Sequence, residues 1–167
     1  MFDKPFVILR HKLTIGYKMD LKELLRTQSA EILESALQSL NCAHLKSYDR
    51  STEGENKNRL LNLLTLTQQC VIEKKLLPMK EYSAQIAKER FNAGFGLHEV
   101  HTAFNALEEE IWNRVTKQIK PENLGEALGL VSTVLGAGKE ELALTYVQLA
   151  SKSKTPTLNL TELFGRN

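Results

Sequence analysis

The chain has 167 residues, which suits a single domain that buries a sizeable core. Hydrophobic residues make up 42% and charged residues 25%, and no apolar run is long enough to cross a bilayer. The formal charge is +2, but residues 1–18 hold four basic side chains and one acidic, a local +3, so the other 149 residues sum to −1. A nearly neutral body disfavours DNA or RNA as the main partner.

The two ends of the chain are predicted to lie outside the folded domain. Residues 1–18 are interpreted as an extension, disordered or a start-site artefact, ahead of one helical domain at 19–150. The apolar run in this extension lasts only about five residues, fewer than the ~7–15 of a secretory signal. The tail at 151–167 is interpreted as a solvated linker with a small apolar hook at Leu160, Leu163 and Phe164.

Helical periodicity of apolar residues runs through nearly the whole chain, and strand-like alternation is nearly absent. Asp20 is placed to cap the first helix, and Pro78 and Pro121 suit the first turns of later helices. We therefore predict helices over residues 21–40, 57–77, 78–91, 97–119, 121–135 and 140–150, with a connection or weak helix over 41–51.

Three breaks are predicted between these helices. The stretch YDRSTEGEN, with Gly54, is interpreted as a loop. Gly94 and Gly96 are expected to supply positive φ at a helix end and a close helix–helix approach. The segment GAGK, residues 136–139, is interpreted as a helix junction, because it lacks the strand and the Ser or Thr of a phosphate-binding loop.

The predicted fold is all-α, a globin-like bundle of about six to eight helices without haem. The leucine-dense segment 57–77 has apolar residues on several sides, which predicts a central buried helix. Cys42 and Cys70 lie in apolar helical contexts without CxxC spacing, so we expect two buried, reduced thiols.

The two histidines after the glycines, His98 and His101, are candidate ligands. On a helix over 97–119, His101 lies about 60° from the centre of the apolar stripe and His98 about 120° away. Zinc would need further ligands that the spacing does not offer, so no metal site is expected. Either histidine remains a candidate haem ligand, because one suffices, but Phe104 already occupies the core-facing side.

His101 shares one strip of this helix with three further side chains, Asn105, Glu108 and Trp112. A carboxylate beside a buried face usually needs a cation, and Arg90, just before the glycines, is the expected partner of Glu108. Two interpretations stay open: an ion pair that pins two helices, or the polar edge of a pocket that senses a ligand. Enzyme activity is not expected, since no nucleophile motif is present.

The segment MKEYSAQIAKERFNAGFGLHEVHTAFNALEEEIWNRV, residues 79–115, resembles the N-terminal sensory domain of RsbR-type stressosome proteins, the RsbT co-antagonist family. The resemblance covers about residues 45–120 and includes the upstream RLLNLLTL. It implies a non-haem, globin-like domain that dimerises and relays a signal. The STAS output domain usual in that family is not expected after the last helix, so its phosphorylation and anti-sigma roles are not carried over.

The resulting hypothesis is a non-enzymatic sensory or interaction domain of bacterial stress signalling, cytoplasmic, homodimeric and without a cofactor. Its other partner would be a signalling protein of the STAS or kinase type, with no nucleic acid and no membrane. The candidate residues for the structural or signal pocket are Arg90, Gly94, Gly96, His101, Asn105, Glu108 and Trp112. The alternative is a globin-type sensor that binds haem or a small molecule through His98 or His101.

Overall fold

The computed structural model describes residues 19–153, and the expectations for 1–18 and for the apolar hook of the tail lie outside them. The described part contains helices and no strand, which confirms the predicted all-α fold and a helix number within the expected range. The helices are α1 (Leu21–Thr27), α2 (Ser29–Cys42), α3 (Lys46–Asp49), α4 (Glu53–Glu73), α5 (Leu77–Asn92), α6 (Leu97–Gln118) and α7 (Pro121–Ser153).

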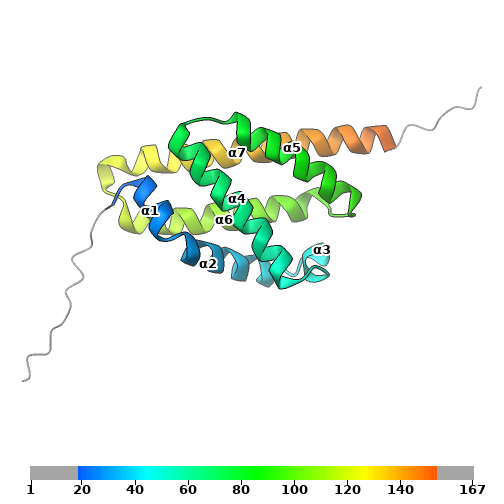
Figure 1. Ribbon diagram of the computed structural model, residues 1–167, viewed down its shortest axis with the longest axis horizontal. Helices are drawn as coiled ribbons and strands as arrows, with labels where there is room; N and C mark the ends of the chain where they lie inside the picture. The colour runs from blue at the N-terminus through cyan, green and yellow to red at the C-terminus, as the bar shows by residue number, and fades with distance from the viewer. Residues whose placement is uncertain (1–18, 154–167) are drawn as a thin grey trace, which may run out of the picture.

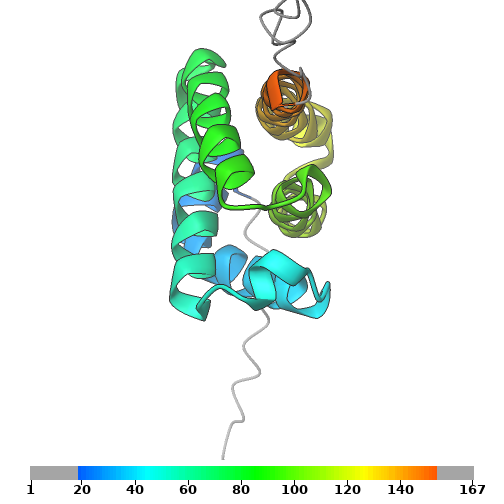
Figure 2. The same ribbon diagram turned by 90° about the vertical axis from the view of Figure 1, so that its right-hand side faces the viewer.

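The long helices form a bundle with α7 along one edge. In Figure 1, α6 and α7 run beside each other, and α4 crosses them obliquely. Figure 2 shows α4 and α5 on one side of the bundle and α6 and α7 on the other. Helix α7 packs against both α5 and α6, and α2 packs against α6 and α4. The C-terminal end of α7 extends past the other helices (Figure 1).

The apolar stripe predicted for α6 supplies much of the core. Its members lie three and four residues apart, so they share one face of the helix. Leu107, Ile111 and Val115 are fully buried, and Phe104 is 1% exposed. The same face meets the middle of α7, where Val131, Leu135 and Leu142 are also fully buried. The stripe of α6 and these residues of α7 therefore supply a large part of the core.

Helix starts follow the local sequence signals. The carboxylate of Asp20 accepts the Glu23 backbone N–H at 2.8 Å, as predicted, and caps α1. Thr52 and Glu55 form a capping box at the start of α4. This cap corrects the loop predicted for YDRSTEGEN: Gly54 lies in the first turn of α4 and breaks nothing.

The helix predicted over 21–40 is divided in two. Helix α1 ends at Thr27, and α2 begins at Ser29. The residue between them, Gln28, has non-helical backbone angles, and its side chain bonds that of Gln118 on α6. Helical periodicity on both sides conceals a one-residue break of this kind.

The junction predicted at GAGK is wrong, because α7 continues without interruption through residues 136–139. A Cβ built on Gly138 would lie 2.9 Å from Phe104, 2.9 Å from the Ser83 hydroxyl and 3.0 Å from Met79. The glycine therefore allows α7 to approach α5 and α6 closely, and its packing offsets the helix-breaking tendency that the sequence suggested.

Two predictions of burial are also corrected. Leu61 and Ile72 of α4 are 43% and 48% exposed, so this leucine-dense helix is not buried on all sides. Cys42, in the last turn of α2, is exposed, whereas Cys70 is buried as expected. An apolar residue near a helix end is a weaker indicator of the core than one inside a long stripe.

Candidate functional site

The corner between α5 and α6 is built by two glycines with different roles. Gly94 has a φ of +80°, which confirms the predicted left-handed residue after α5. Gly96 has a φ of −70° and is the N-cap of α6, so the positive φ predicted for it is wrong. A Cβ on Gly96 would lie 2.8 Å from the ring of His98, so this glycine leaves room for the histidine side chain.

Glu99 fixes this corner from inside and was not singled out from the sequence. Its carboxylate accepts the backbone N–H of Ser47 at 2.8 Å, the Ser47 hydroxyl at 2.7 Å and the backbone N–H of Gly96 at 2.7 Å. Burial raises the pKa of Glu99, but these three hydrogen bonds outweigh it and leave the pKa below its ordinary value. The carboxylate thereby joins α3 to the start of α6.

The strip predicted on α6 converges on one cation, Lys139 of α7. Its ammonium donates to Glu108 Oε2 at 2.6 Å and to Asn105 Oδ1 at 3.2 Å. The Nε2 atom of His101 lies 3.2 Å from the backbone oxygen of Lys139. Three of the predicted residues therefore meet at the seam between α6 and α7. Lys139 itself belongs to the segment that was interpreted as a junction.

The predicted pair of Arg90 and Glu108 is wrong, because Glu108 pairs with Lys139. The guanidinium of Arg90 lies instead over the ring of Phe95, with its central carbon 5.3 Å from the ring centroid. Sequence distance from the glycines placed Arg90 correctly at the corner, but it did not show which side of α6 the arginine faces. Arg90 and Glu108 therefore lie in separate parts of the domain, and the predicted pocket residues do not form one site.

The side chains of Trp112 and His98 form no hydrogen bond with Lys139 or with Arg90. Trp112 is 42% exposed, and His98 is exposed beside Gly96. Among residues 19–153, no three His, Cys, Asp or Glu side chains gather where they could hold a metal ion. As a haem ligand, His101 would have to give up its contact with the Lys139 carbonyl oxygen.

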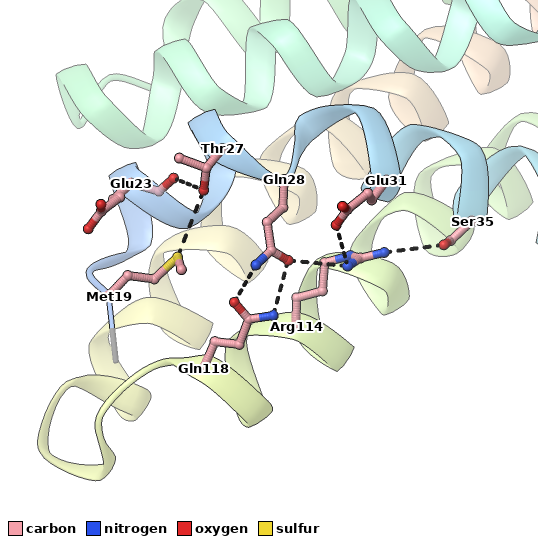
Figure 3. Close-up of polar contacts among 8 residues, drawn as sticks. All are labelled: Met19, Glu23, Thr27, Gln28, Glu31, Ser35, Arg114 and Gln118. Atoms are coloured by element: carbon pink, nitrogen blue, oxygen red, sulfur yellow. Dashed lines mark hydrogen bonds and ion pairs between the residues drawn. The ribbon is translucent and has the colours of Figure 1, made fainter. Parts of the chain in front are cut away.

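A second polar network joins α2 to α6 (Figure 3). Arg114 donates to Gln28 Oε1 at 3.2 Å, to Glu31 Oε2 at 3.3 Å and to Ser35 Oγ at 3.3 Å. Gln118 adds a bond from its Nε2 to Gln28 Oε1 at 3.1 Å. The network connects side chains of the two helices to one another, which suits a structural link between them.

The outer face of α7 is a feature that the predicted residues do not explain. Leu144 is 52% exposed and Val147 is 61% exposed. Gly125, Gly129 and Gly136 have nothing within 4 Å of an added Cβ. A glycine inside a helix costs about 0.5–1 kcal/mol relative to alanine, and no contact in the described part of the chain requires these three.

Comparisons of the chain with protein-family models, curated proteins and solved structures give no match. In the described part of the chain, no helix has the length and apolar character needed to cross a membrane. A functional proposal for this chain therefore rests on its side-chain geometry and on the resemblance of residues 79–115. The most unusual element in that geometry is the open face of α7.

Proposed function

We propose that this protein is a non-enzymatic sensory or regulatory interaction domain that forms a homodimer through the open face of α7. The observation that carries the proposal is the combination on this face of two large exposed apolar side chains with three glycines. A cytoplasmic role in bacterial stress signalling rests on the resemblance of residues 79–115 to stressosome sensor domains. The resemblance also suggests a STAS-type or kinase-type partner.

The residues of this face share one side of the helix. At 100° per residue, Val147 and Gly129 point in the same direction, and Gly125, Gly136 and Leu144 lie within about 60° of them. Glu140 lies between Gly136 and Leu144 on the same side and is exposed. The face thus has glycines toward its N-terminus, with the exposed Glu122 and Glu126 beside them, and large apolar side chains toward its C-terminus.

This division makes the face complementary to itself when two copies run antiparallel. With Gly136 on the two-fold axis, Val147 of one copy lies opposite Gly125 of the other, and Leu144 lies within one residue of Gly129. Each large side chain then faces a position that lacks one. The antiparallel arrangement also keeps the two Glu140 carboxylates apart, whereas a parallel one places them together.

A signal can pass from this seam to the rest of the domain through α7 itself. The opposite side of α7 places Gly138 against Phe104, and at the edge of the open face Lys139 pairs with Glu108 of α6. A shift of α7 at the dimer seam would therefore disturb tightly packed contacts with α5 and α6. Because packed interfaces favour discrete arrangements, such a shift can act as a two-state relay.

Sedimentation equilibrium of the wild type and of Leu144→Glu and Val147→Glu tests the dimer. The wild type is expected to dimerise, and each variant to dissociate about tenfold or more readily, because a buried apolar side chain is replaced by a charge. Leu61→Glu is the matched control, since Leu61 is 43% exposed on α4, and it should dimerise normally. A monomeric wild type, or equal effects of all three changes, would contradict the proposal.

A further inference from the structure

A small cavity between α4, α5 and α6 is lined by four polar side chains that are all hydrogen-bond donors. They are Tyr48, Arg59, Tyr82 and Arg90, and the remaining lining is apolar. The cavity has a volume of about 20 Å³. A space of this size holds one group about as large as a water molecule.

Both arginines line this cavity, and no carboxylate is among its lining residues. Their guanidinium carbons lie 5.1 Å (Arg59) and 5.3 Å (Arg90) from the same ring centroid, that of Phe95. Burial and the charge of Arg90 both lower the pKa of Arg59, as expected for neighbouring cations. Neither arginine belongs to an ion pair with another residue of the described chain.

The hydrogen bonds of Arg59 go to neutral groups. Its Nη1 atom donates to Ser51 Oγ at 2.8 Å and to Asn56 Oδ1 at 2.9 Å. Arg90 has its ring contact with Phe95 and no side-chain hydrogen bond to a residue between 19 and 153. The positive charge of the pair is therefore left without a partner of opposite sign in direct contact.

The carboxylates that act on the lining side chains are engaged elsewhere. The exposed Glu89 accepts a hydrogen bond from the Gln85 amide at 3.0 Å. Glu55 accepts the backbone N–H of Thr52 at 2.8 Å in the capping box of α4. Glu99 accepts hydrogen bonds from Ser47 and Gly96 at the corner. These three carboxylates act on the cavity from a distance, so they reduce its positive potential without filling it.

The two tyrosines add neutral donors. Burial raises the pKa of Tyr48 to about 12, and burial also raises the pKa of Tyr82. Both phenols therefore keep their protons at neutral pH. Within the described chain, neither hydroxyl donates a hydrogen bond to another residue. A group that enters the cavity would meet O–H and N–H donors and no carboxylate.

We infer that this cavity is a binding site for a small, singly charged anion, held between Arg59 and Arg90 and reached by the tyrosine hydroxyls. Chloride or the charged end of a small carboxylate matches the space and the donors. A singly charged ion is favoured over a doubly charged one, because Glu55 and Glu99 already offset part of the arginine charge. The site lies away from the outer face of α7 and does not depend on dimer formation.

Chloride-35 line broadening, with sodium acetate as the competitor, tests this site. The wild type is expected to broaden the chloride line saturably, and acetate should reverse the broadening. Arg59→Gln and Arg90→Gln should each weaken chloride binding about tenfold, the loss typical of a charged hydrogen-bond donor. Arg26→Gln makes the same charge change on the exposed surface of α1, so it should leave binding unchanged.

Tyr82→Phe keeps the charge and removes one donor, so it tests the site even if an arginine variant does not fold. It should weaken chloride binding about two- to tenfold. Line broadening that does not saturate in the wild type would overturn the inference. The same conclusion would follow if Arg26→Gln weakened binding as much as Arg90→Gln, or if Tyr82→Phe had no effect.

Discussion

Lys139 of α7 and Glu108 of α6 form an ion pair of 2.6 Å, and their side chains are only 21% and 13% exposed. The pair lies at the contact between α6 and α7, which any movement of α7 would disturb. The exposed pair of Lys74 and Glu126, at 3.4 Å with both side chains more than 60% exposed, offers a natural comparison. Burial distinguishes the two pairs, since solvent screens the second much more strongly.

Glu108→Ala should lower the free energy of unfolding by about 1–3 kcal/mol, because it leaves the ammonium of Lys139 half-buried without its main partner. Urea unfolding monitored by circular dichroism measures the change. The matched control, Glu126→Ala, should alter stability by no more than about 1 kcal/mol. Equal losses of unfolding free energy in the two variants would show that the buried pair stabilises the fold no more than the exposed pair does.

Gly138→Ala should destabilise the protein by about 1–3 kcal/mol, because the new methyl group would overlap Phe104, Ser83 and Met79. Gly54→Ala is the control, since nothing lies within 4 Å of a Cβ there, and it should be neutral or slightly stabilising. Thermal unfolding of both variants gives the comparison. A stable Gly138→Ala protein would mean that α7 does not need this close approach.

Helix periodicity and capping residues were sufficient to predict the all-α fold class. The stripe through Phe104 and Ile111 identified α6, and Asp20 and Pro121 marked helix starts. The glycine at 138 was misinterpreted, because a local pattern shows the cost of glycine in a helix but not the neighbour that requires it. That neighbour, Phe104, is more than 30 residues away in the sequence.

The candidate site was predicted only in part for a similar reason. The strip of His101, Asn105 and Glu108 follows from helical spacing, and the structure brings these three residues together. Their shared partner, Lys139, comes from another helix, so spacing within one helix could not identify it. Glu99 was overlooked because its partners, Ser47 and Gly96, are backbone and hydroxyl groups that carry no charge signal.

Glu99 should make stability depend on pH in a defined direction. Its folded pKa lies below the ordinary value of 4.5, so its contribution is present above that value and is lost as the pH falls through the folded pKa. Glu99→Gln should therefore cost about 1–3 kcal/mol at pH 7 and less at pH 3. Urea unfolding at both pH values tests this. A cost that does not change with pH would exclude the charge as its source.

The two thiols should react at very different rates. Cys42 is exposed, whereas Cys70 is buried and burial raises its pKa above the usual 9.0, which lowers its thiolate fraction. A chromogenic disulfide reagent should modify one thiol rapidly in the native protein and the second only after denaturant is added. The fast phase should be absent from Cys42→Ser. A fast phase that persists in this variant would contradict the structure.

The direction of the proposed dimer can be tested by cross-linking in a Cys42→Ser, Cys70→Ala background. An antiparallel seam predicts that Gly125→Cys and Val147→Cys, on two differently tagged chains, form an intermolecular disulfide in mixed dimers. The control is Val147→Cys alone, which should not cross-link to its own copy. Efficient cross-linking of that control would indicate a parallel seam.

The most direct measurement is the molar mass of the wild-type protein, obtained by light scattering during size-exclusion chromatography across a range of concentrations. The open face of α7 predicts a dimer, with twice the chain mass of 18.9 kDa. A mass that stays at 18.9 kDa at every concentration would contradict the proposed relay, because the exposed Leu144 and Val147 would then have no second copy to cover them.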